Sequence, residues 1–411
     1  MSSFGMPLAR RGMPDSLERL FVALLSFKKT NKAGAAILTE RHRLTDARVR
    51  ADVVSDKTVW RTVTLSTDSG LSGVGEASLE GTDEVFHRRL QQAAGSLVGK
   101  ALPMTGSRSG NQSPCDLPTR TIRSAIDQAL CDLWAQIAGQ SLSDFLGAAS
   151  PSPRIPLYAN INRATRNRSA EGFAANARAA SAEGYRAIKL APFDNLTPEA
   201  CDTDEGRGCI VAGLKRIRDV ANAVPDCEVM VDCHWRFSLA AAEQLIDALA
   251  ETGVVWLECP LPERPDRIVD LKSLRARANR KGMRLCGLET FGGWDKVGSF
   301  VLGGAYDVVM PDVKHAGSLS TIIDLAAKTQ AAGTVVSLHN PSGPVAHLHS
   351  AHAMAALGTA ERLEVQWNES PMFFTLTDPP PVLDDGFCAP GRSPGLGACL
   401  IAEPSPAGVD P

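Results

Sequence analysis

Seven short apolar segments between residues 187 and 367 each carry, end in or are followed by an ionisable residue. In chain order these residues are Lys189, Asp232, Glu258, Glu289, Asp312, His339 and Glu364. A single carboxylate after a strand usually caps the next helix or faces solvent, so one such residue would not indicate a site. Seven residues in the same position relative to their segments indicate a polar cluster assembled from many parts of the chain.

Three of these residues, Asp232, Glu258 and Glu289, are carboxylates on consecutive segments. Like charges a few ångströms apart cannot all stay ionised without a cation between them. Carboxylate oxygens are hard ligands that suit Mg²⁺, whereas Zn²⁺ prefers His and Cys. The sequence therefore predicts a Mg²⁺ site at Asp232, Glu258 and Glu289.

The apolar segments themselves are predicted to be strands of a parallel sheet. Their apolar residues do not alternate with polar ones, which is typical of strands buried on both faces. Ala- and Leu-rich stretches predicted to be helical, such as 238–251 and 318–332, separate most of them. The eight predicted strands are 157–161, 187–190, 229–231, 254–257, 285–288, 308–310, 335–338 and 363–367.

Eight such strands in about 210 residues fit a (β/α) barrel, in which the active site lies where the strands end. The seven ionisable residues would then meet at one face. A doubly wound open sheet is the alternative architecture, but it needs a Gly-rich phosphate turn after its first strand. The segment NINRATRNRSA after that strand contains no glycine, which favours the barrel.

The N-terminal half has a different pattern. Alternating and β-branched residues predict strands at 48–54 and 58–67, a turn at 68–70 and a return strand from Gly73 to Glu76. Helical spacing of apolar residues predicts helices at 84–99 and 119–139. Three strands followed by helices indicate a small α+β domain, and the polar stretch 101–118 is predicted to be a loop.

Composition limits the possible partners. A net charge of −3 gives no field suited to nucleic acid or anionic lipid. Ten cysteines without a CxxC pair indicate reduced thiols in a cytosol. The apolar run at 20–27 is too short to span a bilayer, and lysines follow it where a cleavage site would lie. We therefore expect a cytoplasmic protein that binds neither nucleic acid nor membranes.

The order Lys, Asp, Glu, Glu, Asp, His, Glu over residues 189–364 resembles the mandelate racemase subgroup of the enolase superfamily. The segments DSGLSGVGEAS (68–78), TIRSAIDQALCDLWAQIAGQSLSDFLGA (121–148) and GYRAIKLAPFD (184–194) resemble it too, so the likeness covers about residues 45–370. The resemblance implies an α+β capping domain over a modified (β/α)₇β barrel with one essential Mg²⁺. The implied parts are an extension (1–43), the capping domain (44–150, completed by 370–411) and the barrel (151–369).

The same resemblance implies roles for the remaining residues. His339 and Asp312 match the family's His–Asp pair, in which the histidine is the base. Glu364 matches the position that hydrogen-bonds the substrate carboxylate, as a proton-sharing acid beside Lys189. The segment Asp232-Cys-His234, with Arg236 beyond it, resembles the acid-sugar dehydratases, particularly galactonate and mannonate dehydratase, in which such a histidine is an acid or base.

The expected reaction is therefore dehydration of an aldonic or aldaric acid, a small carboxylate, to a 2-keto-3-deoxy acid, by an enzyme that forms a homo-oligomer. Four further polar residues near the strand ends are candidate substrate contacts, although Asp194 could equally cap a helix: Asn160, Arg163, Asp194 and Arg236. Glu76 and residues 78–84 match the part of the capping domain that closes over substrate.

One difference from the family's racemases narrows the set of possible reactions. The family's racemases carry a Lys-x-Lys pair, but Ala191 occupies the second position here. Epimerisation or cycloisomerisation stays open if His234 is the second base. Lys314, two residues past Asp312, could be a base or a charge beside the site or on the surface.

Two other classes of protein remain as alternatives. A metal-dependent aldolase or a phosphate-binding barrel would need a phosphate-binding site at the last two strands. This is disfavoured because no Gly-rich turn follows Glu364. A non-catalytic barrel would leave the carboxylate triad and the His–Asp pair without a use.

Overall fold

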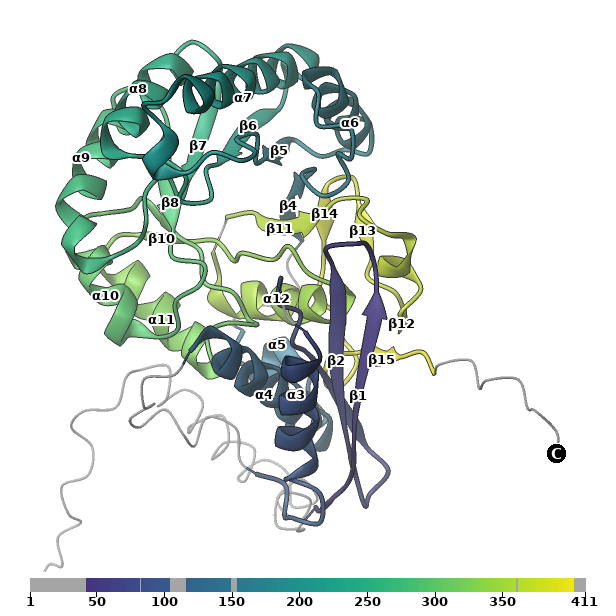
Figure 1. Ribbon diagram of the computed structural model, residues 1–411. Helices are drawn as coiled ribbons and strands as arrows, with labels where there is room; N and C mark the ends of the chain where they lie inside the picture. Colours follow the sequence, from purple (N-terminus) through teal and green to yellow (C-terminus); the bar gives the residue numbers. More distant parts are fainter. Residues whose placement is uncertain (1–41, 82, 104–115, 149–153, 360, 403–411) are drawn as a thin grey trace, which may run out of the picture.

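The computed structural model describes residues 42–81, 83–103, 116–148, 154–359 and 361–402 (Figure 1). Nearly all of the expected N-terminal extension and most of the predicted loop at 101–118 lie outside these ranges.

The described residues from 42 to 148 form an α+β unit, here called the cap. Its three strands form an antiparallel sheet in the order β1-β2-β3. The elements are β1 (Leu44–Val53), β2 (Val59–Thr67), β3 (Ser72–Glu76), α3 (Glu84–Gly95), α4 (Leu117–Ile137) and α5 (Leu142–Phe145). Helix α4 packs so closely on β3 that a Cβ atom on Gly73 or Gly75 would lie 2.2 and 2.0 Å from helix carbonyl oxygens. Only glycine fits at these two positions.

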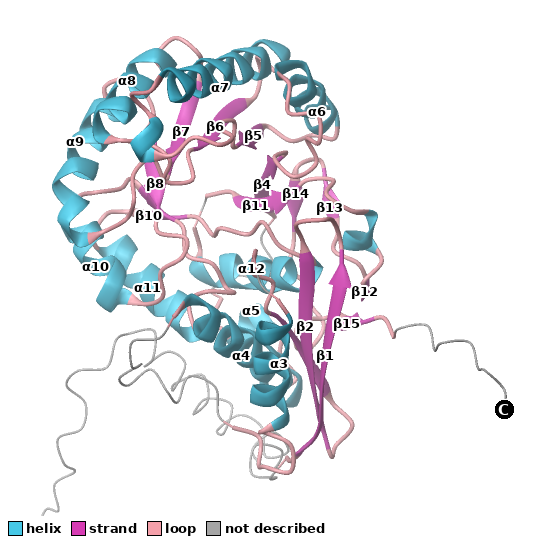
Figure 2. Cartoon of the chain, in the orientation of Figure 1, coloured by secondary structure: helices cyan, strands magenta, loops and turns pink. Residues whose placement is uncertain are grey.

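Residues 154–369 form the larger unit, in which helices surround the strands (Figure 2). All eight predicted strands are present: β4 (Ile155–Asn160), β5 (Ala187–Leu190), β6 (Glu228–Asp232), β7 (Val254–Glu258), β8 (Arg284–Gly287), β9 (Val308–Val309), β10 (Val335–Val336) and β11 (Leu363–Gln366). The helices are α6 (Ala170–Ala182), α7 (Asp204–Ala223), α8 (Leu239–Leu249), α9 (Ile268–Asn279), α10 (Trp294–Leu302), α11 (Leu319–Ala331) and α12 (Pro344–Leu357), with short 3₁₀ turns η1 (Pro198–Ala200), η2 (Pro265–Arg267) and η3 (Pro371–Phe374).

Successive strands from β4 to β10 pair in parallel, and β11 returns to pair with β4. The predicted fold class, a capping domain with a parallel barrel-type sheet, is thus confirmed. Within the described residues, however, no backbone pairing joins β10 to β11. Side chains bridge this seam instead: Ser337 Oγ donates to the Arg362 carbonyl oxygen (2.7 Å), and Asn340 Nδ2 donates to the Glu364 carbonyl oxygen (3.0 Å).

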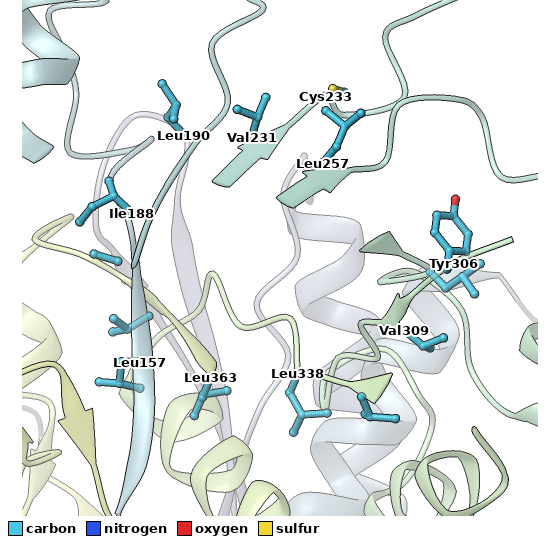
Figure 3. Close-up of a cluster of buried hydrophobic side chains, with 14 of the residues drawn as sticks. Leu157, Ile188, Leu190, Val231, Cys233, Leu257, Tyr306, Val309, Leu338 and Leu363 are labelled. Carbon is cyan, nitrogen blue, oxygen red and sulfur yellow. The ribbon is translucent and has the colours of Figure 1, made fainter. Parts of the chain in front are cut away.

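Alternation along each strand sorts side chains into two layers. One layer, which includes Leu157, Val231 and Leu257 (Figure 3), belongs to a cluster that also contains helix residues such as Phe173 and Leu245. The other is a separate cluster of buried side chains, namely Tyr158, Ala187, Met230, Trp256, Cys286, Val308 and Met310. Two residues beyond Met230 and Trp256, on the same side of their strands, come Asp232 and Glu258. The polar layer therefore lies directly above the inner apolar layer.

The C-terminal segment adds strands that the sequence did not predict: β12 (Thr377–Asp378), β13 (Leu383–Asp384), β14 (Phe387–Cys388) and β15 (Cys399–Leu400). Strand β14 pairs with the start of β4, and β15 pairs with β12. The Leu396 N–H donates to Asp132 of the cap (2.8 Å), so the segment contacts both units. The exact domain boundaries stay a prediction.

Within the described ranges, no helix is both long and apolar enough to cross a bilayer. The nine cysteines in these ranges are all free thiols.

Asp132 on α4 allows a test of how the C-terminal segment is held. Its carboxylate accepts the backbone N–H groups of Val74 (3.0 Å) and Leu396 (2.8 Å). Replacing Asp132 with Ala leaves these buried donors without partners, and we expect a loss of about 1–3 kcal/mol in unfolding free energy for each. Urea denaturation measures this. Asp324→Ala, which removes only a surface ion pair with Lys328, should cost less than about 1 kcal/mol.

The pH dependence has a defined sign. Burial raises the pKa of Asp132 from 3.8 to about 6, against hydrogen bonds from Leu396, Gln136 and Val74 that lower it. A carboxyl whose pKa is higher in the folded than in the unfolded state adds to the unfolding free energy. This contribution is fully present below the unfolded-state pKa and is lost as the pH rises through the folded-state pKa. The difference in unfolding free energy between the wild type and Asp132→Ala should thus decrease between about pH 4 and pH 6. A difference that grows over this window would contradict the assignment.

Candidate active site

A buried lysine lies at the centre of the polar layer. Lys189 Nζ is 2.8 Å from both Glu258 Oε1 and Glu364 Oε1, and Asn160 Nδ2 donates to the same Glu364 oxygen (2.7 Å). Burial alone would raise the pKa of Glu364, but the charges of Lys189 and His339 lower it to about 2. Burial lowers the pKa of Lys189, but the two glutamates raise it well above its ordinary value. Lys189 is therefore held protonated and Glu364 ionised.

This arrangement bears on the expected role of Glu364. Lys189 and Asn160 both contact Glu364 Oε1, so this oxygen has protein partners. The role of Glu364 as a proton-sharing acid that hydrogen-bonds the substrate carboxylate stays a prediction.

His339 and Asp312 form the expected pair. His339 Nδ1 lies 2.9 Å from Asp312 Oδ2. Its other ring nitrogen, Nε2, lies 3.5 Å from Glu289 Oε2 and 4.0 Å from Glu364 Oε2. The carboxylate of Asp312 orients the ring so that Nε2 faces the polar layer, which is the geometry that a general base requires.

Asp312 also has a cationic partner, Lys314, that the sequence did not specify. Lys314 Nζ lies 2.5 Å from Asp312 Oδ2, and the Lys314 N–H donates to Oδ1 (2.7 Å). Lys314 is only 3% exposed, so it is not a surface charge. Burial would raise the pKa of Asp312, but the charges of Lys314 and His315 hold it far below its usual range. Asp312 thus stays ionised beside His339.

The three predicted metal ligands are all buried. Asp232 and Glu258 lie opposite each other in the β6–β7 pairing. Burial and the charges of Asp232 and Glu258 raise the pKa of Glu289 well above its ordinary value, and burial raises that of Glu258 as well. This excess of buried negative charge favours a cation here.

The geometry of a complete metal site is not formed. Among the described residues, no group of three or more His, Cys, Asp or Glu side chains is close enough to hold a metal ion. Protein donors occupy two of the carboxylates: Asp232 Oδ2 lies 2.8 Å from His234 Nε2, and Glu258 accepts from Lys189 and from Trp256 Nε1 (2.9 Å). The donor chemistry and the charge fit Mg²⁺, and the ligand set stays a prediction.

Strained backbone accompanies each predicted ligand. Positive φ angles occur at His234 (48°) and Trp235 (58°) after Asp232, at Cys259 (45°) after Glu258 and at Leu288 (74°) before Glu289. Such conformations in non-glycine residues cost of order 1–3 kcal/mol and cluster at functional sites. The strained backbone thus lies at the ends of β6, β7 and β8, next to the three predicted ligands.

His234 lies at the edge of the polar layer. Burial lowers its pKa, but the larger effect of the Asp232 charge raises it. Its side chain is 37% exposed, more than those of Asp232 and His339. It is therefore the histidine of the site most open to solvent.

The four candidate substrate contacts differ in their partners, although the charge of Arg236 acts on Asp194 and lowers its pKa. Asn160 joins the polar layer through Glu364, as described above. The other three make protein contacts: Arg163 Nη1 donates to the Pro341 carbonyl oxygen (3.2 Å), Asp194 pairs with Arg168 (2.6 Å) and Arg216 (2.9 Å), and Arg236 donates to the Phe193 carbonyl oxygen (2.9 Å). Their substrate-binding role stays a prediction.

Two residues of the site were missed in the sequence. The Asn340 N–H donates to Glu364 Oε2 (2.9 Å). Glu263 accepts from the Leu288 N–H (2.6 Å) and the Tyr306 hydroxyl (2.9 Å), next to Glu289, and burial raises its pKa to about 7. Asn340 adjoins His339 and could have been found from its position, but no feature of the segment around Glu263 signals its contacts.

The sequence also matches known families over both units. The family described as "Mandelate racemase / muconate lactonizing enzyme, N-terminal domain" matches residues 34–147. The family described as "Enolase C-terminal domain-like" matches residues 172–403, more than half of the chain. The chain belongs to the mandelate racemase/muconate lactonizing enzyme family of the enolase superfamily. The resemblance noted in the sequence is confirmed.

Curated relatives of this enolase-superfamily chain are dehydratases, which are hydro-lyases. A D-galactonate dehydratase of Ralstonia nicotianae is 24% identical over 373 residues, which are 85% of this chain and 92% of the relative. A D-gluconate dehydratase of Thermoproteus tenax is 27% identical over 306 residues, 71% of this chain but only 59% of that relative. Among solved structures, an enolase protein from Sargasso Sea environmental sequencing is 29% identical with a TM-score of 0.70, covering 88% of this chain and 95% of that one.

Proposed function

We propose that the protein dehydrates an aldonic or aldaric acid to a 2-keto-3-deoxy acid, with Mg²⁺ as cofactor. The observation that carries the proposal is the orientation of His339, whose Nε2 faces Glu289 and Glu364 while Asp312 holds Nδ1. The dehydratases among the relatives act on D-galactonate and D-gluconate according to their names, which supports the substrate class.

His339 takes the α-proton. The C–H bond next to the substrate carboxylate breaks, and the proton moves to Nε2 of His339. Asp312 is ionised beside Nδ1 and stabilises the imidazolium that forms. When bound, Mg²⁺ held by Asp232, Glu258 and Glu289 supplies positive charge that offsets the negative charge developing on the substrate.

Loss of the β-hydroxyl completes the dehydration. The C–O bond breaks, and the hydroxyl leaves with a proton as water. His234, the more exposed histidine, donates that proton, and the resulting enol tautomerises to the keto acid. Lys189 is fixed between Glu258 and Glu364, so it contributes a permanent positive charge rather than a mobile proton.

The test is a panel of aldonic and aldaric acids with Mg²⁺, read out as 2-keto product. We expect at least one acid to react, EDTA to abolish the reaction and added Mg²⁺ to restore it. Mg²⁺ should also raise the melting temperature, because a ligand that binds only the folded state stabilises it. Glu289→Gln should lose both responses.

Two results would count against this assignment. If no acid yields a keto product but solvent deuterium enters the α-position, the protein is an epimerase or related isomerase. If neither occurs and Mg²⁺ leaves the melting temperature unchanged, the proposal fails.

A further inference from the structure

A fully buried carboxylate of the cap contacts the segment that carries His339. Glu76 ends β3 and is 0% exposed. Its Oε1 accepts the Gly343 N–H (2.9 Å) and the Ser78 hydroxyl (2.6 Å), and its Oε2 accepts the Ala346 N–H (2.9 Å). Glu76 thus joins the end of β3 to the segment that follows His339.

These bonds hold the first turn of α12, which begins at Pro344 directly after Gly343. The N-cap residue, Gly343, has no side chain to satisfy the first N–H groups of the helix. A carboxylate from another unit fills this role, and its charge is favourable at a helix N-terminus. His339 lies only four residues before Gly343, in the connection from β10 to α12.

The contact is tight. A Cβ atom on Gly343 would lie 2.8 Å from Glu76 Oε2 and 2.9 Å from Trp60 Cδ2. The φ angle of Gly343 is −73°, which any residue can adopt. The close approach of the cap, rather than backbone conformation, is what requires glycine at position 343.

The cap also holds the segment that carries Asp312. Gln128 on α4 accepts the Glu76 N–H through Oε1 (3.0 Å) and donates to the Val313 carbonyl oxygen through Nε2 (3.2 Å). Ser124 Oγ accepts the Gly317 N–H (2.7 Å). The two barrel segments that supply the His–Asp pair are therefore both attached to one region of the cap.

We infer that Glu76 is a positioning residue, through which the cap fixes the location of His339 relative to Asp312 and the substrate. This inference rests on the proposed function for its catalytic consequence, but its structural part does not. Burial raises the pKa of Glu76, while its hydrogen bonds and the charge of Lys314 lower it. A carboxylate is needed because both oxygens accept backbone N–H groups.

The test combines amide hydrogen exchange with kinetics on Glu76→Gln, whose amide can offer only one accepting oxygen. We expect exchange across residues 339–346 to accelerate at least roughly tenfold. With an acid that the wild type dehydrates, kcat should fall about 10- to 100-fold, since misplacement by about 1 Å costs this much, while KM changes less than about threefold. Gly343→Ala places a Cβ atom against Glu76 and should cause the same changes, faster exchange across residues 339–346 and a lower kcat. Glu171→Gln makes the same change at an exposed carboxylate of α6 and should stay near wild type in both exchange and kcat.

Hydrogen exchange tests the structural part of the inference, and kcat tests its catalytic part. Unchanged exchange in Glu76→Gln and Gly343→Ala would overturn the inference. Faster exchange with unchanged kcat would show that Glu76 stabilises α12 without positioning His339, and would also overturn it. If the wild type acts on no acid sugar, the proposed function fails, and hydrogen exchange alone decides whether Glu76 fixes the segment.

Discussion

His339→Asn is expected to lower kcat/KM for the dehydration by on the order of 10²–10⁴, the usual contribution of a positioned general base. It should also abolish entry of solvent deuterium at the α-carbon of the substrate. The Asn amide can still donate to Asp312 Oδ2, which His339 Nδ1 now approaches to 2.9 Å, so the fold should survive. What is lost is the Nε2 atom that faces the polar layer.

His87→Asn provides the matched control, because His87 lies on α3 of the cap and should retain wild-type rates. Deuterium exchange is the decisive measurement, because it reports proton removal even where loss of water is blocked. Exchange that persists in His339→Asn would remove His339 from the role of base. His234→Asn would then be the next variant to measure.

Lys189→Met is expected to have the largest effect on stability. It removes the cation that lies 2.8 Å from both Glu258 and Glu364 in a site where all three side chains are at most 1% exposed. Breaking a buried ion pair by deleting one partner costs about 3–5 kcal/mol, because the remaining charge is buried without compensation. Urea denaturation should show this loss, and dehydration should be lost as well.

A double variant separates charge from packing. Lys189→Met with Glu364→Gln has one fewer uncompensated carboxylate, so it should recover part of the stability lost in the single variant. Lys215→Met, which removes a surface ion pair with Asp219, should cost less than about 1 kcal/mol. If Lys189→Met is as stable as Lys215→Met, the buried cluster is not held by this lysine.

The strands of the barrel could be predicted because each is buried on both faces, which produces a short continuous apolar segment in the sequence. The position of Lys189, Asp232 and Glu258 followed from the same pattern, since each lies at the end of such a segment. The strands of the C-terminal segment had no comparable signal. Strand β14 is two residues long and pairs with β4, so its pairing depends on residues more than 200 positions away.

The hydrogen-bond and ion-pair partners of the site residues were also not predictable, because most of them lie far away in the sequence. Lys314 was correctly placed near Asp312, but only the folded chain shows that it is buried on that carboxylate. Glu76 and Gly343 are 267 residues apart in the sequence, and no local periodicity connects them. Hydrogen bonds between distant segments depend on how the two units dock, which hydrophobic patterns do not encode.

The seam between β10 and β11 separates the strand that leads to His339 from the strand that carries Glu364. Elsewhere in the sheet, neighbouring strands are fixed by backbone register, and a slip by one residue would turn every side chain to the opposite face. At the seam the strands are joined by the side chains of Ser337 and Asn340. The 4.0 Å spacing between His339 Nε2 and Glu364 Oε2 therefore depends on side-chain contacts across the seam and not on a ladder of backbone hydrogen bonds.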